Sequence, residues 1–571
     1  MKRKFWAAAA MALTAVVMAA AMQAGGGAGA SYDVVIRHGH IVDGTGSPWY
    51  AGDIGIRGGR IAAIGNLAGA KAKETIDAAG RVVAPGFIDM LGQSEITILV
   101  DPHVPSKIFQ GITTEITGEG DSVAPQSAAT LADERGEFAH YHVTADWRTL
   151  AQYFARLRRQ GIGINLGTYV GATQARRYVI GDGDRAATPA ELARMEALVA
   201  EAMREGAMGV SSALQYPPAP YASTAELTAL AAVSARYGGI YATHMRSEGD
   251  GEMAALEEVA HIARAAHTGV EIFHLKAGGK ANWGKMPQIV AFLDRARSEG
   301  LDIEADTYAY TAWNNDLAAF IPPWAHDGGD AKMLARLKDP ATRARIRKNL
   351  ETPSSAWDNE WQEIAGPEGV LISSVGNPAL LPLEGKTLAQ IAADWHEDTM
   401  DALFDLLIKD NAFTNVSVFA MSEPDVELAL KQPWVAVDND YPGVAPTGLL
   451  GREHAHPRAY GTFPRIIRKY VRGEHLLSLP EAIRKFTALP AQREHLTNRG
   501  VLKQGMWADI VVFDPARVHD VGTYANPNRL AVGMDYVLVN GVPVIADGKM
   551  TNALPGQVLL GPGYASRRAG R

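Results

Sequence analysis

The clearest pattern in this sequence lies in residues 238–274, GGIYATHMRSEGDGEMAALEEVAHIARAAHTGVEIFH. Two short apolar strands, IYATH and VEIFH, flank a segment whose apolar residues recur on one helical face, at Met253, Leu256, Val259, Ala260 and Ala263. Gly269 is expected to cap that helix. A strand, a helix and a second strand in this order predict two parallel strands joined by a crossover helix.

The same alternation runs through the middle of the chain. Eight strand candidates lie between residues 81 and 440, namely RVVAPGFIDM, GITTEITG, GIGINLGTYVG, GAMGVSSALQY, GGIYATH, GVEIFH, LDIEADTYAY and WVAVDND. They predict a closed (β/α)8 barrel over about residues 85–495, with an insertion at about 313–412 that is rich in Trp, Pro and charges. An open, doubly wound sheet is the alternative. It is disfavoured because no G-x-G-x-x-G follows the first strand.

Both ends of the chain have sequence patterns that are typical of β-strands and turns. Residues 31–84 contain β-branched runs separated by glycine pairs. Residues 496–571 contain similar runs, with Asn540-Gly541 and Asp547-Gly548 as hairpin turns. We therefore expect the two ends to pair in one small β-sandwich domain beside the barrel.

The first thirty residues are expected to be a secretory signal peptide. A basic start (KRK, 2–4) precedes an apolar run (5–22) and a small-residue stretch that ends in AGA (28–30). The protein is then exported, to the periplasm or the medium. A membrane anchor is the alternative interpretation of the same run, but no later stretch approaches a membrane span.

Composition excludes several classes of function. The chain has 571 residues, 47% hydrophobic and 21% charged, which is enough for a large core in two or more domains. A formal charge of −8 argues against a nucleic-acid surface. The absence of Cys excludes disulfides, thiolate nucleophiles and zinc ribbons. Any transition metal must be held by His and carboxylate side chains.

Four polar side chains fall at the ends of strand candidates. His244 and His274 end consecutive strands, Glu119 follows GITTEITG, and Asp438 follows WVAV. Because the carboxyl ends of barrel strands meet at one face, these side chains can converge on one metal ion. For any one of them, the alternative is a hydrogen-bonded core His or a solvated carboxylate.

Several longer motifs carry a resemblance to a known family. GRVVAPGFIDM, QGITTEITGEG, SSALQYPPAPYAS, YATHMRSEG, IFHLKAGG, DTYAY, HPRAYGTFPR and GMWADIVVFDP occur in this order. The sequence resembles the metal-dependent amidohydrolases, and most closely their N-acyl-D-amino-acid deacylase (D-aminoacylase) branch, from about residue 32 to 559. PGFID and ADIVVFDP are general to that superfamily, whereas QYPPAPYAS, ATHMR and HPRAYGTFPR are more specific to the branch.

The departures from the family pattern concern the metal ligands. The family continues PGFID with His-x-His, but this sequence has Leu91 and Gln93 at those positions. Glu119 stands where the branch has a Cys, and a carboxylate is a competent zinc ligand. The resemblance therefore implies one divalent ion, with zinc expected, held by Glu119, His244 and His274. Glu95 is a possible substitute ligand for a second ion.

The resemblance also implies roles in catalysis and substrate binding. Asp438 matches the carboxylate that carries a proton from water to the leaving amine, with Asp440 as the nearest competitor. Lys276 and Arg458 match positions that hold the carboxylate of an N-acyl amino acid. Two aromatic residues, Tyr216 and Tyr308, match positions that line the site.

Other histidines are weaker candidates. His454 and His456 lie near the expected site and could touch metal or substrate, or belong to a solvated loop. Two further His-x-His pairs are expected on the surface, at His38 with His40 and at His140 with His142.

We expect an exported, metal-dependent hydrolase of linear amides, most simply an N-acyl-D-amino-acid deacylase that binds a small-molecule N-acyl amino acid. One alternative is a related amidohydrolase acting on dipeptides, cyclic amides or esters. The other is a binding protein that has kept the barrel and lost catalysis.

Overall fold

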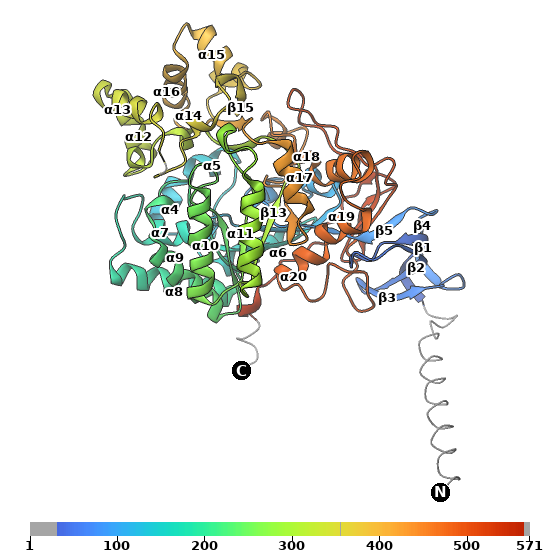
Figure 1. Cartoon of the computed structure of the whole chain (residues 1–571). Helices are drawn as coiled ribbons and strands as arrows, with labels where there is room; N and C mark the ends of the chain where they lie inside the picture. Colours follow the sequence, from blue (N-terminus) through green and yellow to red (C-terminus); the bar gives the residue numbers. More distant parts are fainter. Residues whose placement is uncertain (1–30, 355, 565–571) are drawn as a thin grey trace.

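The computed structural model describes residues 31–354 and 356–564, so the expected signal peptide at residues 1–30 lies outside the described residues. Figure 1 shows a central barrel with a helical unit above it (α12–α16) and a blue β domain (β1–β5) to its right. None of the described helices is long and apolar enough to cross a bilayer.

The middle of the chain forms the predicted (β/α)8 barrel. Its strand positions, in order, are β6 (Phe87–Asp89), β7 (Ile112–Thr117), β8 (Asn165–Thr168) with β9 (Val170–Gly171), β10 (Gly209–Ala213), β11 (Ile240–His244), β12 (Val270–Ile272), β13 (Ile303–Thr307) and β17 (Val435–Val437). Neighbouring strands pair in parallel. A parallel bridge between Gly92 and Tyr441 joins the two ends of the series. Because the sheet closes on itself, the alternative of an open, doubly wound sheet is wrong.

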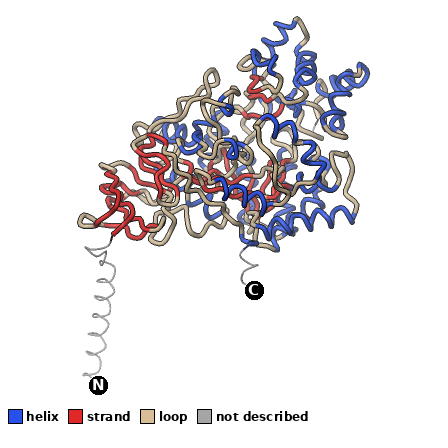
Figure 2. Tube along the Cα trace, turned by 180° about the vertical axis from the view of Figure 1, so that it is seen from behind, coloured by secondary structure: helices blue, strands red, loops and turns tan. Residues whose placement is uncertain are grey.

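Helices between the strands cover the outside of the barrel (Figures 1 and 2). They are α6 (Leu150–Gln160), α7 (Ala172–Val179), α8 (Pro189–Glu205), α9 (Thr224–Arg236), α10 (Glu252–Ala266), α11 (Met286–Ser298), α17 (Glu423–Lys431) and α19 (Leu479–Phe486). The α10 helix buries Leu256, Val259 and Ala263 as its spacing predicts. It ends at His267, which adopts a left-handed φ of 52°. The prediction of a cap at Gly269 is therefore wrong.

The two ends of the chain form one β domain. Its strands are β1 (Ser31–Ile41), β2 (Tyr50–Arg57), β3 (Arg60–Gly65), β4 (Lys71–Asp77), β5 (Val82–Pro85), β18 (Ile510–Phe513), β19 (Met534–Val539), β20 (Val542–Ala546) and β21 (Lys549–Met550). They are hydrogen-bonded as a single sheet of nine, in which β5 pairs antiparallel with β18. Aliphatic side chains from both ends share its core.

The expected hairpin turns of this domain are present. Asn540 and Gly541 have positive φ angles of 50° and 81°, and Asp547 and Gly548 have 49° and 72°. Two consecutive positive φ angles are the requirement of the type I′ turn, which Asn-Gly and Asp-Gly satisfy at low cost. The turns connect β19 to β20 and β20 to β21.

The segment after β13 forms a separate unit on the barrel. Its elements are β14 (Trp313–Asp316), α12 (Asp330–Lys338), α13 (Pro340–Leu350), α14 (Glu360–Glu363), β15 (Val370–Ser374), α15 (Leu388–Trp395), α16 (Thr399–Asp410) and β16 (Asn415–Val418). The three strands form an antiparallel sheet, and the helices pack on it around a core of their own. The unit contacts the barrel through α14, where Glu360 Oε1 accepts from Gln215 Nε2 at 2.7 Å.

A buried ammonium group holds the seam where the barrel closes. Lys107, from the short helix α3 (Pro105–Ile108), is fully buried. Its Nζ donates to Asp89 Oδ2 at 2.7 Å, to Asn439 Oδ1 at 3.0 Å and to the carbonyl oxygen of Tyr441 at 2.7 Å. Asp89 ends the first barrel strand, and Asn439 and Tyr441 follow the last, so Lys107 ties the two together.

Replacing Lys107 by Met is expected to lower the free energy of unfolding by about 3–5 kcal/mol, because it leaves the Asp89 carboxylate buried without a cation. Urea denaturation measures this loss. Lys73→Met is the matched control, since it removes an exposed ion pair with Asp33 and should cost far less stability. If both variants lose the same small amount, Lys107 does not hold the seam.

Candidate active site

Three side chains predicted as metal ligands meet at the carboxyl ends of the barrel strands. Glu119 follows β7, His244 is the last residue of β11, and His274 lies two residues after β12. Glu119 Oε1 lies 3.2 Å from His244 Nδ1 and 3.1 Å from His274 Nε2. One ligand atom from each residue lies within 4.8 Å of the others. Two imidazoles and a carboxylate at this spacing are a donor set that suits zinc.

The second nitrogen of each imidazole also has a partner. His244 Nε2 lies 2.9 Å from Gln215 Oε1. His274 Nδ1 lies 2.7 Å from Lys276 Nζ and 3.0 Å from Glu248 Oε1. Such contacts fix the orientation of a metal-binding imidazole. The rings are therefore held with one nitrogen toward Glu119.

The positions of the missing His-x-His pair are filled by an aliphatic residue and an amide. Leu91 is buried in an apolar cluster. Gln93 donates from Nε2 to Glu119 Oε2 at 2.9 Å and to Asp440 Oδ1 at 3.1 Å. Its neutral NH2 group thus bridges two carboxylates. Glu95 contributes no ligand atom to the group of three.

The structure revises the choice between the two aspartates after β17. Asp438 is fully buried, lies outside the cavity wall, and has the carboxyl group of Asp306 beside it. Burial, and then the neighbouring carboxylate of Asp306, raise the pKa of Asp438 well above its usual value. The structure thus places Asp438, predicted as the proton carrier, in the barrel interior beside a second carboxyl group and not in the cavity wall.

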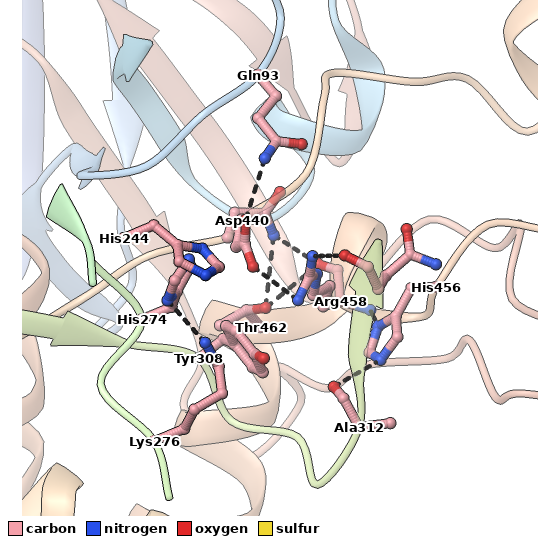
Figure 3. A network of polar contacts seen from close by, with 12 residues as sticks. Gln93, His244, His274, Lys276, Tyr308, Ala312, Asp440, His456, Arg458 and Thr462 are labelled. Atoms are coloured by element: carbon pink, nitrogen blue, oxygen red, sulfur yellow. Dashed lines mark hydrogen bonds and ion pairs between the residues drawn. The ribbon is translucent and has the colours of Figure 1, made fainter. Parts of the chain in front are cut away.

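Asp440 is the aspartate that lines the cavity, together with Glu119, His244 and His274. It adopts a left-handed φ of 44°, and its backbone N–H donates to the carbonyl oxygen of Leu91 at 2.9 Å. Figure 3 shows its carboxylate between Gln93 and Arg458. Arg458 Nη1 lies 2.8 Å from Asp440 Oδ2.

Of the two expected substrate clamps, only Lys276 lines the cavity. Its Nζ donates to both oxygens of Glu248, at 2.8 and 2.7 Å. Arg458 is buried behind the cavity wall, with its guanidinium 4.6 Å from the ring centroid of Tyr308. The direct contact with substrate predicted for Arg458 is therefore replaced by an ion pair with Asp440.

Of the two aromatic candidates, Tyr216 lies in the cavity wall and Tyr308 lies behind it. Tyr216 lines the cavity, with its ring centroid 5.1 Å from that of His244. Tyr308 is buried against Arg458, outside the cavity wall. His456 is also buried, and its Nδ1 accepts from the backbone N–H of Arg458 at 3.0 Å. His454 hydrogen-bonds to the carbonyl oxygen of Tyr524.

Sequence reasoning missed several residues of the cavity. Gln215 follows β10, so the rule that selected the other strand-end residues could have found it. Glu248 lies in the loop after β11, where no strand-end rule applies. The separate unit after β13 contributes Trp313, Asn315, Asp358 and Glu363 to a cavity of about 390 Å³.

Comparison with known proteins places these features in a family. The model of the amidohydrolase family matches residues 391–545. The N-acyl-D-glutamate deacylase of Alcaligenes xylosoxydans xylosoxydans is 34% identical over 528 residues, which cover 92% of this chain and 96% of that protein.

Solved structures of N-acyl-D-amino-acid deacylases are similar to this chain in fold and in sequence. The N-acyl-D-glutamate deacylase of Bordetella bronchiseptica, complexed with zinc and a phosphonate mimic of the tetrahedral intermediate, has a TM-score of 0.77 and 34% identity, covering 93% of this chain and 100% of that one. A D-aminoacylase structure concerned with a binuclear metal centre, activated by one metal and attenuated by the second, has a TM-score of 0.76 and 32% identity with the same coverage.

The identity extends over nearly the whole chain, and the barrel carries a Glu–His–His group at the face where such enzymes act. This chain therefore belongs to the amidohydrolase family, in the branch of the D-aminoacylases and N-acyl-D-amino-acid deacylases, and is a hydrolase of carbon–nitrogen bonds other than peptide bonds.

Proposed function

We propose that this protein removes the acyl group from N-acyl-D-amino acids by hydrolysis. The observation that carries the proposal is the convergence of Glu119, His244 and His274 with Asp440 on one cavity. A metal-binding group next to a carboxylate is what amide hydrolysis requires. A binding protein that had lost catalysis would have no need to keep both.

The metal is proposed to be a single zinc ion held by Glu119, His244 and His274. The fit rests on the donor set, since two imidazoles and one carboxylate are typical of catalytic zinc sites with an open position. When bound, zinc polarises an amide carbonyl and lowers the pKa of water. Gln93 places an NH2 group between Glu119 and Asp440, and the nitrogen of an amide is a donor only, because its lone pair is delocalised into the carbonyl.

Asp440 is proposed as the group that moves the proton. In amide hydrolysis the oxygen of water bonds to the acyl carbon, the carbon–nitrogen bond breaks, and a proton moves from the water to the leaving nitrogen. Among the carboxylates of the cavity wall that bind no metal in this scheme, Asp440 is the one that Gln93 joins to the ligand Glu119. Arg458 and Gln93 hold its two oxygens in place.

Lys276 is proposed to hold the carboxylate of the amino acid. Its ammonium group lies in the cavity wall beside His274, within reach of a substrate whose amide is near the metal ligands. Glu248 holds Lys276 in this position. Arg458 is assigned a positioning role through Asp440.

Export by the leader at residues 1–30 remains a proposal from the sequence.

The protein is expected to bind one equivalent of zinc per chain, and Glu119→Gln should weaken that binding at least about tenfold because it removes a charged ligand. Elemental analysis after dialysis against a series of zinc concentrations measures both values. Glu95→Gln is the matched control, which removes a nearby carboxylate that is not among the three ligands. Two firmly bound equivalents, or equal loss in both variants, would overturn the assignment.

Asp440→Asn should lower turnover of N-acyl-D-amino acids by about two to four powers of ten, the usual contribution of a positioned acid–base group. Zinc content should be unchanged, since Asp440 is not a ligand. Asp438→Asn is the comparison and should change turnover by less than about tenfold, because the amide mimics a carboxyl group that burial already keeps protonated. The opposite ranking would return the proton-transfer role to Asp438.

A further inference from the structure

The part of the cavity that lies away from the metal ligands is lined by acidic side chains. Asp121, Asp316 and Asp330 are exposed at its mouth, and Asp358 and Glu363 are buried deeper in the wall. Four of these five belong to the unit inserted after β13. The walls of a site set the charge that its ligand can carry without repulsion.

Most of these carboxylates lack a cation. Of the basic side chains in the wall, Arg177 is bound to Asp121 and Asp182, at 3.2 and 3.3 Å. Lys276 is bound to Glu248. Within the described residues, no ion pair is formed by Asp316, Asp330, Asp358 or Glu363.

The deeper wall also contains one buried hydrogen-bond acceptor without a donor among the described residues, the Oδ1 of Asn315. Asn315 is 8% exposed, donates from Nδ2 to Glu360 Oε1 at 2.6 Å, and leaves its Oδ1 without a partner among the described residues. Glu363 is 9% exposed and packs against Gly249. Both residues line the cavity. A ligand with an N–H donor can supply the partner that Asn315 Oδ1 lacks.

A cationic group of the substrate matches both the negative charge of this wall and its unpaired acceptor. An ammonium group carries three donors and a guanidinium group five, each with a positive charge that matches the wall. A carboxylate at the same place would face the acidic groups and the unpaired Asn315 Oδ1, and would be rejected. The cavity volume of about 390 Å³ is in the range of small-molecule sites.

We propose that this enzyme prefers N-acyl amino acids with a cationic side chain, such as the N-acyl derivatives of lysine and arginine. The inference rests on the proposed deacylase function and adds the substrate class. Lys276 takes the α-carboxylate at the metal side of the cavity. The wall formed by Asp358, Glu363 and Asn315 takes the side-chain cation, with Asp316 and Asp330 attracting it at the mouth.

The test compares kcat/KM of the zinc-loaded protein for three substrates in both enantiomers. They are N-acetyl-lysine, N-acetyl-2-aminoheptanoate, in which a methyl group replaces the ammonium, and N-acetyl-glutamate. The lysine substrate should exceed the methyl isostere by about tenfold or more, and glutamate should be the poorest. The advantage of lysine should shrink as salt is raised from about 0.01 to 1 M, because ions screen charges at the exposed mouth.

Two variants locate the preference in the wall. Glu363→Gln and, separately, the exposed Asp330→Asn should each lower the lysine-to-isostere ratio by about three- to tenfold. Glu368→Gln is the matched control, since it removes a charge from the same unit outside the cavity wall and should leave the ratio unchanged. Asp330→Asn, at an exposed site, keeps the test valid if Glu363→Gln fails to fold.

The outcomes distinguish failure of the proposed deacylase function from failure of the proposed substrate class. If no N-acyl amino acid is hydrolysed by the zinc-loaded protein, the proposed function fails. If the substrates are hydrolysed without preference for lysine, or with preference for glutamate, only the assignment of a cationic substrate class is overturned. If the preference exists but Glu363→Gln and Asp330→Asn leave the ratio unchanged, the acidic wall is not its source.

Discussion

The closure of the barrel around a buried ammonium is the constraint on which the site depends. Lys107 binds Asp89 at the end of the first strand and Asn439 and Tyr441 beyond the last one. Asp440 lies between Asn439 and Tyr441. The contacts that close the sheet therefore also fix the backbone at Asp440, which lines the cavity. In a low-dielectric interior, such a cation is tolerated only where several acceptors surround it. Stability and site geometry therefore share one set of hydrogen bonds.

The barrel and the metal ligands could be predicted from the sequence because both follow from local rules. Apolar strands alternate with amphipathic helices, and the carboxyl ends of parallel strands meet at one face. His244 ends its strand and His274 follows two residues after the end of its own, so the strand ends alone place them close together. The hairpins of the β domain were predictable for a similar reason, since Asn-Gly and Asp-Gly prefer the backbone angles that the turns adopt.

The remaining site residues depend on contacts that a single sequence does not encode locally. Asp438 and Asp440 are two residues apart, and Asp440, which has a left-handed φ, is the one that reaches the cavity. Glu248 lies in a loop and is held there by Lys276 and by a segment more than a hundred residues later, where Asp358 accepts from its backbone N–H at 2.7 Å. Arg458 was recognised as a cation of the site, but its partner could not be foreseen.

The pairing of β5 with β18 has a consequence for how this chain matures. Residues 82–85 find their partner only at residues 510–513, and Lys107 finds Asn439 more than three hundred residues later. Contacts between such distant segments form slowly, because a long loop must be closed before they contribute any stability. While a ribosome is still making the chain, the first strands therefore have an unprotected edge that only the final segment covers. The β domain can therefore be completed only after the last hairpins have been synthesised.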